Sequence, residues 1–238
     1  MSVIIKSVVK GSPAYKAKIS TGDTLISIDG NEIMDVLDYR FYQNEEKLTV
    51  EFINPKGKIK RKKIKKKIYE EIGLEFETYL MDKKHSCRNK CVFCFIDQLP
   101  KGLRESLYFK DDDSRLSFLQ GNYVTLTNMS DEDVDRIIRY RLEPINISFQ
   151  AMRPELRCKM LHNRFAGDAL KKAEKFRDAG IIMNGQIVLC KGENDGEELE
   201  YSLTELYQYL PYLQSLSIVP VGLSKYREGL YPLEPFTK

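Results

Sequence analysis

The most constraining feature of this sequence is a regular alternation of predicted strands and helices from residue 123 onward. Short runs rich in branched apolar residues predict strands, and the longer mixed stretches between them predict helices of about a dozen residues. The expected strands are 123–127, 145–149, 181–189 and 216–219, and the expected helices are 131–141, 167–179 and 197–210. Such alternation is typical of parallel βαβ units, so we expect an α/β fold built on a parallel βα barrel.

A further strand is expected ahead of these, at 74–76. The five expected strands do not complete a barrel of about eight βα units. The chain stops at Lys238, shortly after the last expected strand. We therefore expect a partial barrel that is truncated at its C-terminal end.

The first 67 residues predict a separate, small β-rich domain. Its expected strands are 3–8, 24–28, 48–53 and the basic run that follows, and its expected helices begin at residues 13 and 35. Ser12 is a suitable cap for the first helix, and Pro13 suits its first turn. We place the domain boundary between residues 67 and 68, with the α/β domain occupying 68–238.

The run Lys58–Lys67 is almost solidly basic, although the net charge of the chain is only +3. One interpretation is a patch that binds RNA or another anionic surface. The other is the solvent face of a last strand, with Ile59 and Ile64 facing inward and lysines protecting a sheet edge. No aromatic residue interleaves with the lysines, which favours the edge strand.

Three of the five cysteines, Cys87, Cys91 and Cys94, are crowded into one short segment. The N-terminus lacks a basic region followed by a long apolar stretch, and no run approaches the roughly 18 apolar residues that span a bilayer. We therefore expect a cytoplasmic protein with no membrane partner. Disulfides are rare in that compartment, so the crowded thiols favour metal or redox chemistry.

The cysteine spacing, C-x3-C-x2-C, lets one loop wrap one iron–sulfur cluster. Three local cysteines would leave one iron of a [4Fe–4S] cluster open to another ligand. A zinc site completed by His85 is an alternative, and so is an electron-transfer cluster whose fourth ligand is Cys158 or Cys190. A redox dithiol formed by Cys91 and Cys94 is a third alternative.

The segments Gly11–Ala14 and Gly22–Gly30, with Ile19 between them, resemble a circularly permuted bacterial PDZ domain. The resemblance implies that a peptide or protein partner adds as an extra strand at a sheet edge. Almost no chain precedes Val3, where we expect the loop that binds a peptide carboxylate. Docking within the chain is therefore an equal expectation.

The cysteine motif, with Phe93 directly before its last cysteine, resembles that of radical S-adenosylmethionine (SAM) enzymes. The resemblance implies that SAM fills the open iron, that Phe93 lies beside the adenine, and that reductive cleavage of SAM yields a radical that abstracts hydrogen from a substrate. It also implies polar cofactor contacts at the end of the second strand, where this chain has Thr127 and Asn128. Residues Leu189–Gly196 resemble the loop after the fourth strand, although a polar turn before the next helix explains them equally well.

The stretches 94–104, 107–113 and 115–123 resemble the DUF512 family, which are PDZ-fronted, radical SAM-like Fe–S proteins of unknown function. The segments 154–157, 160–161 and 186–189 extend the resemblance. Members of the family run longer, so the resemblance implies that a C-terminal region is absent. After the third strand it predicts a Ser-Val-His-Ala segment, and this chain has Ser148, Phe149, Gln150 and Ala151 there.

Active sites of parallel α/β barrels lie at the C-terminal ends of the strands. This rule nominates Thr127, Asn128, Ser148, Gln150, Gln186, Cys190 and Pro220. Gln186 is polar within an apolar strand, which favours a side chain that faces a ligand. Cys190 is better explained as a small buried hydrophobe.

Charged residues near the cysteines are further candidates. Arg104 and Lys110 could neutralise the cofactor carboxylate. Asp111–Asp113 could bind a divalent ion. A solvated turn, or ion pairs with nearby lysines and Arg115, explains the three acids more simply.

Together these features predict a radical SAM-like protein that cleaves SAM and abstracts hydrogen from an unknown substrate. The predicted metal ligands are Cys87, Cys91 and Cys94, and the predicted cofactor-binding residues are Phe93, Thr127, Asn128, Ser148, Gln150 and Gln186. An electron donor of the flavodoxin or ferredoxin type is the expected partner. Two other functions stay open: a PDZ-type binding module whose cluster transfers electrons or senses redox state, and an RNA- or ribosome-associated factor that uses the basic run.

Overall fold

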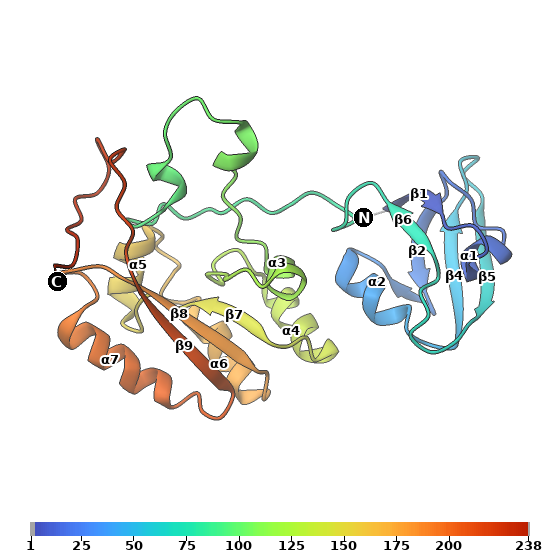
Figure 1. Cartoon of the computed structure of the whole chain (residues 1–238). Helices are drawn as coiled ribbons and strands as arrows, with labels where there is room; N and C mark the ends of the chain where they lie inside the picture. Colours follow the sequence, from blue (N-terminus) through green and yellow to red (C-terminus); the bar gives the residue numbers. More distant parts are fainter. Residues whose placement is uncertain (1–2, 238) are drawn as a thin grey trace. The chain divides into compact units, whose positions relative to one another are not determined.

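Two separate sheets organise the chain, as the ribbon in Figure 1 shows. The computed structural model describes residues 3–237. Contacts between residues divide the chain into two compact units, residues 1–84 and residues 85–238.

The first unit contains an antiparallel sheet whose strands run in the order β5-β4-β2-β1-β6, with β3 paired to β2. The strands are β1 (Val3–Val8), β2 (Thr24–Ile28), β3 (Asn31–Glu32), β4 (Lys47–Ile53), β5 (Ile59–Lys65) and β6 (Leu74–Phe76). Two short helices complete the unit, α1 (Pro13–Lys16) and α2 (Val36–Tyr42). The Ser12 side chain accepts a hydrogen bond from the backbone N–H of Tyr15, so the predicted cap of α1 is confirmed.

Strand β5 corrects one detail of the predicted basic edge. Ile64 is buried, as expected, but Ile59 is 57% exposed. The two residues are five positions apart, and side chains alternate between the faces of a strand, so they cannot both face inward. The lysines of β5 lie on the last strand of the sheet order, as the edge-strand interpretation predicted.

Strand β6 was expected to open the second domain, and the structure shows a different role. It pairs antiparallel with β1, with Val8 opposite Leu74 and Ile5 opposite Phe76. The compact first unit consequently extends to Lys84, whereas the sequence suggested a boundary after residue 67. Gly73, directly before β6, lets the backbone pass close to Ser12. It has a φ of +85°, and an added Cβ would lie 2.3 Å from the Cβ of Ser12.

The second unit is an α/β unit with a parallel sheet in the order β7-β8-β9. Its strands are β7 (Ile145–Ser148), β8 (Met183–Leu189) and β9 (Leu213–Pro220). Its helices are α3 (Ser114–Gln120), α4 (Asp131–Tyr140), α5 (Pro154–Leu161), α6 (Leu170–Asp178) and α7 (Gly196–Tyr207), with two 3-10 turns, η1 (Ile96–Gln98) and η2 (Glu105–Tyr108). The order of these elements confirms the predicted strand–helix alternation for β7, β8 and β9.

The predicted strand at 123–127 is reduced to a single parallel bridge between Val124 and Ile147. Leu126 adopts a left-handed backbone conformation, with a φ of 64°. Residues in this region cannot continue the extended backbone that a strand needs. Among residues 3–237 the second unit therefore has an open parallel sheet of three strands, with Val124 alongside β7, and not a closed barrel.

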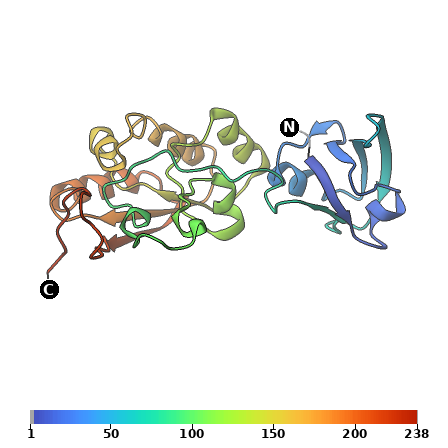
Figure 2. The same ribbon diagram turned by 90° about the horizontal axis from the view of Figure 1, so that it is seen from above.

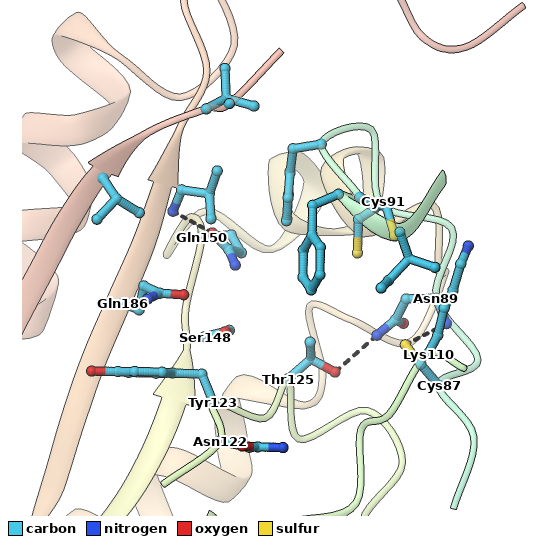
Figure 3. A pocket seen from close by; sticks show the side chains of 18 of the residues that line it. Cys87, Asn89, Cys91, Lys110, Asn122, Tyr123, Thr125, Ser148, Gln150 and Gln186 are labelled. Atoms are coloured by element: carbon cyan, nitrogen blue, oxygen red, sulfur yellow. Dashed lines mark hydrogen bonds between the residues drawn. The ribbon is translucent and has the colours of Figure 1, made fainter. Parts of the chain in front are cut away.

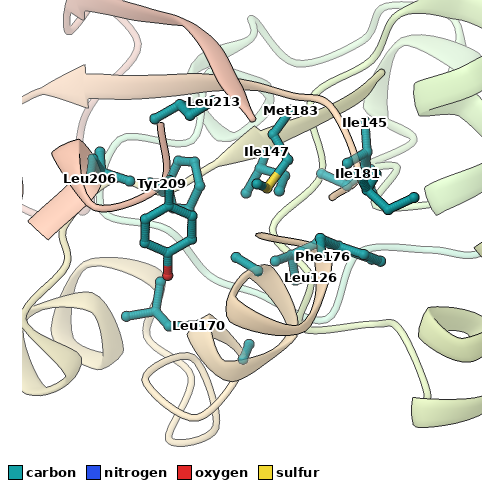
Figure 4. Close-up of a cluster of buried hydrophobic side chains, with 14 of the residues drawn as sticks. Leu126, Ile145, Ile147, Leu170, Phe176, Ile181, Met183, Leu206, Tyr209 and Leu213 are labelled. Carbon is teal, nitrogen blue, oxygen red and sulfur yellow. The ribbon is translucent and has the colours of Figure 1, made fainter. Parts of the chain in front are cut away.

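One face of this sheet packs on helices to form the main core. Ile145, Ile147 and Met183 are fully buried together with Phe176 of α6, and Figure 4 shows them between the strands and that helix. In Figure 2 the yellow-to-tan helices α5 and α6 lie together on one side of this unit. The other face of β7 and β8 is left to line the site described below. None of the helices between residues 3 and 237 combines the length and apolar character needed to cross a membrane.

Candidate cysteine-lined site

A cavity of about 610 Å³ lies in the second unit, between the cysteine segment and the C-terminal ends of the strands. Cys87, Cys91 and Cys94 all line it, and so does Phe93. This volume is in the range typical of small-molecule sites. The structure thus brings the three motif cysteines to one cavity.

The strand side of the cavity follows from the alternation of side chains along β7 and β8. Because Ile147, Phe149 and Ile187 point into the core, their neighbours point the opposite way. Ser148, Gln150, Gln186 and Val188 line the cavity. Ser148 and Gln186 are register partners on adjacent strands. Figure 3 shows Ser148, Gln150 and Gln186 across the cavity from Cys87 and Cys91.

The motif cysteines are partly buried free thiols. Burial, reinforced by the carboxylate of Asp112, raises the pKa of Cys87 to about 11. Burial also raises the pKa of Cys91, and the neighbouring thiols Cys87 and Cys94 raise it further. The backbone N–H of Asn89 donates to Cys87 Sγ at 3.4 Å. Without a bound cation these two thiols stay protonated at neutral pH.

The three thiols are not arranged around a single point. No group of three or more His, Cys, Asp or Glu side chains in the described part of the chain is gathered as the ligands of one metal ion. His85, the expected fourth ligand of a zinc site, does not line the cavity, and its backbone N–H donates to Asp113. The fourth ligand expected for a zinc site therefore does not share the cavity with the three cysteines.

Asn89, which lies between the first two cysteines, ties the cysteine loop to the strand side of the unit. Its Nδ2 donates to Thr125 Oγ1 at 2.9 Å, and its Oδ1 accepts from Asn163 Nδ2 at 2.7 Å and from Thr127 Oγ1 at 3.1 Å. Asn89 is only 4% exposed, so this network is shielded from water. The network fixes the loop that carries Cys87 and Cys91 (Figure 3).

Asp112 continues this network beneath Thr125. Its carboxylate accepts from the backbone N–H of Thr125 at 2.7 Å and from Thr125 Oγ1 at 2.5 Å. Burial raises the pKa of Asp112, while the hydrogen bonds from Thr125 oppose the rise. Asp113 is fully buried and pairs with Arg115 at 2.7 Å. The solvated-turn interpretation of these acids is therefore wrong for Asp112 and Asp113, while the pairing with Arg115 is confirmed.

Arg157 is a fully buried cation directly behind the strand side of the cavity. Its guanidinium donates to the backbone carbonyls of Phe149 at 2.8 Å, Thr125 at 2.8 Å and Ser148 at 3.0 Å, and also to that of Ala166. Burial lowers its pKa to about 10, and Asp112 and Cys91 oppose the lowering. The group stays charged at neutral pH and joins three segments whose carbonyls would otherwise need separate partners.

The two candidate basic residues, Lys110 and Arg104, differ in their position relative to the cavity. Lys110 lines the cavity and pairs with Asp97 at 2.5 Å. Burial lowers its pKa, but the bond to Asp97 and the nearby thiols outweigh this, and the pKa is raised overall. Arg104 lies outside the cavity lining, so only Lys110 keeps the place that the sequence suggested for both.

The loop after β8 closes the end of the sheet. Asn194 is 1% exposed, and its side chain accepts from the backbone N–H of Cys190 at 2.7 Å and donates to the carbonyl of Gln150 at 2.7 Å. It also donates to the carbonyl of Val188 at 3.0 Å. The Asp195 side chain makes no cap bond to α7 and accepts from Gly192 instead. Within the described chain, this loop is therefore a brace between two strand ends and not a side-chain helix cap.

The predicted site residues are only partly together in the structure. Phe93, Ser148, Gln150, Gln186 and the three cysteines share the cavity. Thr127 and Asn128 are outside its lining, and Thr125 takes their place. Asn128 Nδ2 donates to the carbonyl of Ser86 at 2.8 Å, which supports the cysteine segment from behind.

Sequence reasoning missed Asn89, Thr125 and Arg157 as parts of the site. Asn89 lies inside the cysteine motif, which was a usable signal. Arg157 lies in one of the segments that carried the family resemblance, but nothing in its neighbours indicates a buried cation. Cys190 is buried, as expected, and burial raises its pKa to about 12.

Comparison with known proteins assigns the chain to a family. Residues 66–216 match the family model described as a radical SAM-like domain. The chain belongs to the radical SAM-like family. Residues 4–52 match the model of a PDZ domain, so this radical SAM-like protein carries a PDZ domain at its N-terminus. No curated protein sequence matches the chain.

Two solved structures are similar to parts of the chain. A PDZ domain of an SdrC-like protein from Listeria innocua is 20% identical, covers 34% of this chain and 100% of its own, and has a TM-score of 0.30. A radical SAM methyltransferase from Sphaerobacter thermophilus is 12% identical, covers 81% of this chain and 67% of its own, and has a TM-score of 0.36.

Proposed function

We propose that Cys87, Cys91 and Cys94 hold a [4Fe–4S] cluster whose open iron binds SAM, and that a substrate in the same cavity loses a hydrogen atom. The observation that carries this proposal is the placement of all three motif thiols on one ligand-sized cavity in a radical SAM-like domain. Within this proposal the chain is a member of the PDZ-fronted DUF512 group. When bound, the cluster and SAM supply one-electron chemistry that protein side chains lack.

Three thiols from one short segment suit a cluster, because a [4Fe–4S] cube offers separate irons to separate thiolates. All three thiols line the same cavity. The backbone N–H of Asn89 donates to Cys87 Sγ, and this hydrogen bond would also stabilise negative charge on the sulfur.

The other residues of the site would bind and orient. Phe93 offers an aromatic surface beside the thiols, and Lys110 offers a cation whose charge is held by Asp97. Thr127 and Asn128 would position the cysteine loop through Asn89 and Ser86, and would not touch the cofactor. Thr125 would take the cavity position that we expected for them.

The test is metal analysis of the full chain after anaerobic iron–sulfide reconstitution. The proposal predicts about four irons per chain, together with the visible absorbance of an iron–sulfur cluster. Cys87→Ala, Cys91→Ala and Cys94→Ala should each abolish or destabilise the cluster, while Cys158→Ala and Cys190→Ala should retain it. Retention of zinc after anaerobic purification, or loss of iron in Cys158→Ala, would contradict it.

A partner that supplies electrons and a reducing compartment belong to the same proposal. We infer a cytoplasmic protein served by a donor of the flavodoxin or ferredoxin type, because a bound cluster would need an external source of electrons.

The PDZ domain supports a second function, peptide or protein binding. Strand β6 ends the sheet order of the first unit, so its outer edge is available for strand addition. Isothermal titration of the full chain with candidate peptides would test this role without any cluster. The basic strand β5 carries no further observation in favour of RNA.

A further inference from the structure

The strand side of the cavity presents three polar side chains to a ligand. Ser148 is 6% exposed and Gln150 is 3% exposed, and both line the cavity together with the half-buried Gln186. Within residues 3–237, no side-chain hydrogen bond ties Ser148 Oγ or the Gln186 amide to the protein. Both groups can therefore pair with a molecule that occupies the cavity.

The orientation of the Gln150 amide is fixed. The backbone N–H of Val188 donates to Gln150 Oε1 at 2.7 Å. Because an N–H must meet an acceptor, the oxygen faces Val188, and within residues 3–237 Nε2 is left for a partner outside the protein. Gln150 also has a left-handed backbone, with a φ of 66°, and its carbonyl accepts from Asn194. Gln150 therefore presents a hydrogen-bond donor to the cavity. Both the backbone and the side chain of Gln150 are held in place by hydrogen bonds.

The strand side of the cavity is electrically neutral. The charged lining residues are Lys110 and Asp111, which come from one segment near the cysteines. Lys110 is paired with Asp97, and Asp111 accepts from Asn122 at 3.0 Å. The buried Arg157 lies behind this wall, with its donors on carbonyl groups. An ionised ligand group placed against the wall would lose water without gaining an opposite charge.

The wall also lies across the cavity from the thiols (Figure 3). A cofactor held at the cysteines would therefore have this wall on its far side. Val188, Val219 and Val221 continue the lining with apolar surface. A ligand that fits has an apolar body and an uncharged group that accepts a hydrogen bond from Gln150.

We propose that Ser148, Gln150 and Gln186 form the substrate-recognition wall of this cavity, and that they select an uncharged amide- or hydroxyl-bearing substrate over an ionised one. This inference rests on the proposed function only where it calls the ligand the substrate. A site built to hydrogen-bond a ligand discriminates strongly because its polar groups are left unpaired by the wrong one.

The test uses two probes of equal shape, benzamide and benzoate, and ligand-observed NMR titration of the full chain. Benzamide should bind and benzoate should bind at least about tenfold more weakly, which corresponds to about 1.4 kcal/mol. Gln150→Glu keeps the acceptor for Val188 but removes the donor, so it should weaken benzamide about tenfold. Gln186→Leu provides an independent variant, and exposed Gln208→Glu on the end of α7 is the matched control, which should change nothing.

Equal or tighter binding of benzoate, binding of neither probe, or unchanged benzamide binding in Gln150→Glu and Gln186→Leu would overturn the inference. SAM binding by the iron-loaded protein is measured separately on the same variants. If wild-type protein fails to bind SAM but selects benzamide, the proposed function fails and the neutral wall stands. If the variants lose SAM binding but keep benzamide binding, the wall serves the cofactor and the substrate assignment is wrong.

Discussion

Arg157 Nη2 donates to the backbone carbonyl of Ser148 at 3.0 Å, from directly behind the cavity wall. Three more carbonyl groups accept from the same guanidinium. A single cation thus holds the end of β7 against its neighbouring segments, so the shape of the cavity depends on a residue that does not line it.

Arg157→Met should destabilise the second unit by more than about 3 kcal/mol, because several buried carbonyls lose their donor at once. Guanidinium-induced unfolding of the full chain measures this loss. Arg153→Met at the start of the same helix is the control: its exposed pair with Glu198 should contribute little. Equal effects of the two substitutions would contradict the role given to Arg157.

Gly185 allows the close packing behind the site. An added Cβ would lie 2.8 Å from Leu216 and 3.2 Å from the ring of Phe149. Gly185→Ala should cost about 1–3 kcal/mol through overpacking. Gly222→Ala, where a Cβ meets no atom within 4 Å, should be close to neutral. Thermal unfolding of both variants provides the comparison, and a neutral Gly185→Ala would show that β9 packs differently.

The pair of Asp113 and Arg115 makes stability depend on pH. Burial alone would raise the pKa of Asp113, but the hydrogen bond from Arg115 lowers it overall. A carboxyl whose pKa is depressed by folding stabilises the protein above its unfolded pKa of about 3.9, and this contribution disappears as pH falls through the folded value.

Asp113→Asn should therefore cost about 3 kcal/mol at neutral pH, where it leaves a buried guanidinium without its carboxylate. The difference in unfolding free energy from wild type should stay constant down to about pH 5 and shrink below about pH 4. A difference that does not change between pH 7 and pH 3 would contradict the assigned ionisation.

Much of the fold could be predicted because local signals and packing agree. The strand β8 has apolar residues on the core side and Gln186 on the other, and the alternation is visible in the sequence. Ser130 and Asp133 form the capping box that starts α4 where the sequence predicted a helix. The structure places Gln186 in the cavity lining, on the side where the sequence predicts a side chain that faces a ligand, and the contact with a ligand stays a prediction.

The errors arise where long-range contacts decide. Leu74–Phe76 has the sequence of a strand in either domain, and only its pairing with β1 assigns it to the first. Thr125 replaces Thr127 at the cavity because Leu126 turns left-handed, which a branched apolar stretch does not indicate. The partners of Arg157 are backbone carbonyls, which every residue carries, so no local sequence pattern could identify Arg157 as buried.

The central claim is that the three thiols hold a cluster that acts on SAM. The most direct measurement incubates the iron-loaded full chain with dithionite and SAM and quantifies 5′-deoxyadenosine by chromatography. We predict product from the wild type and none from Cys91→Ala. An intact cluster that neither binds SAM nor yields 5′-deoxyadenosine would contradict the account.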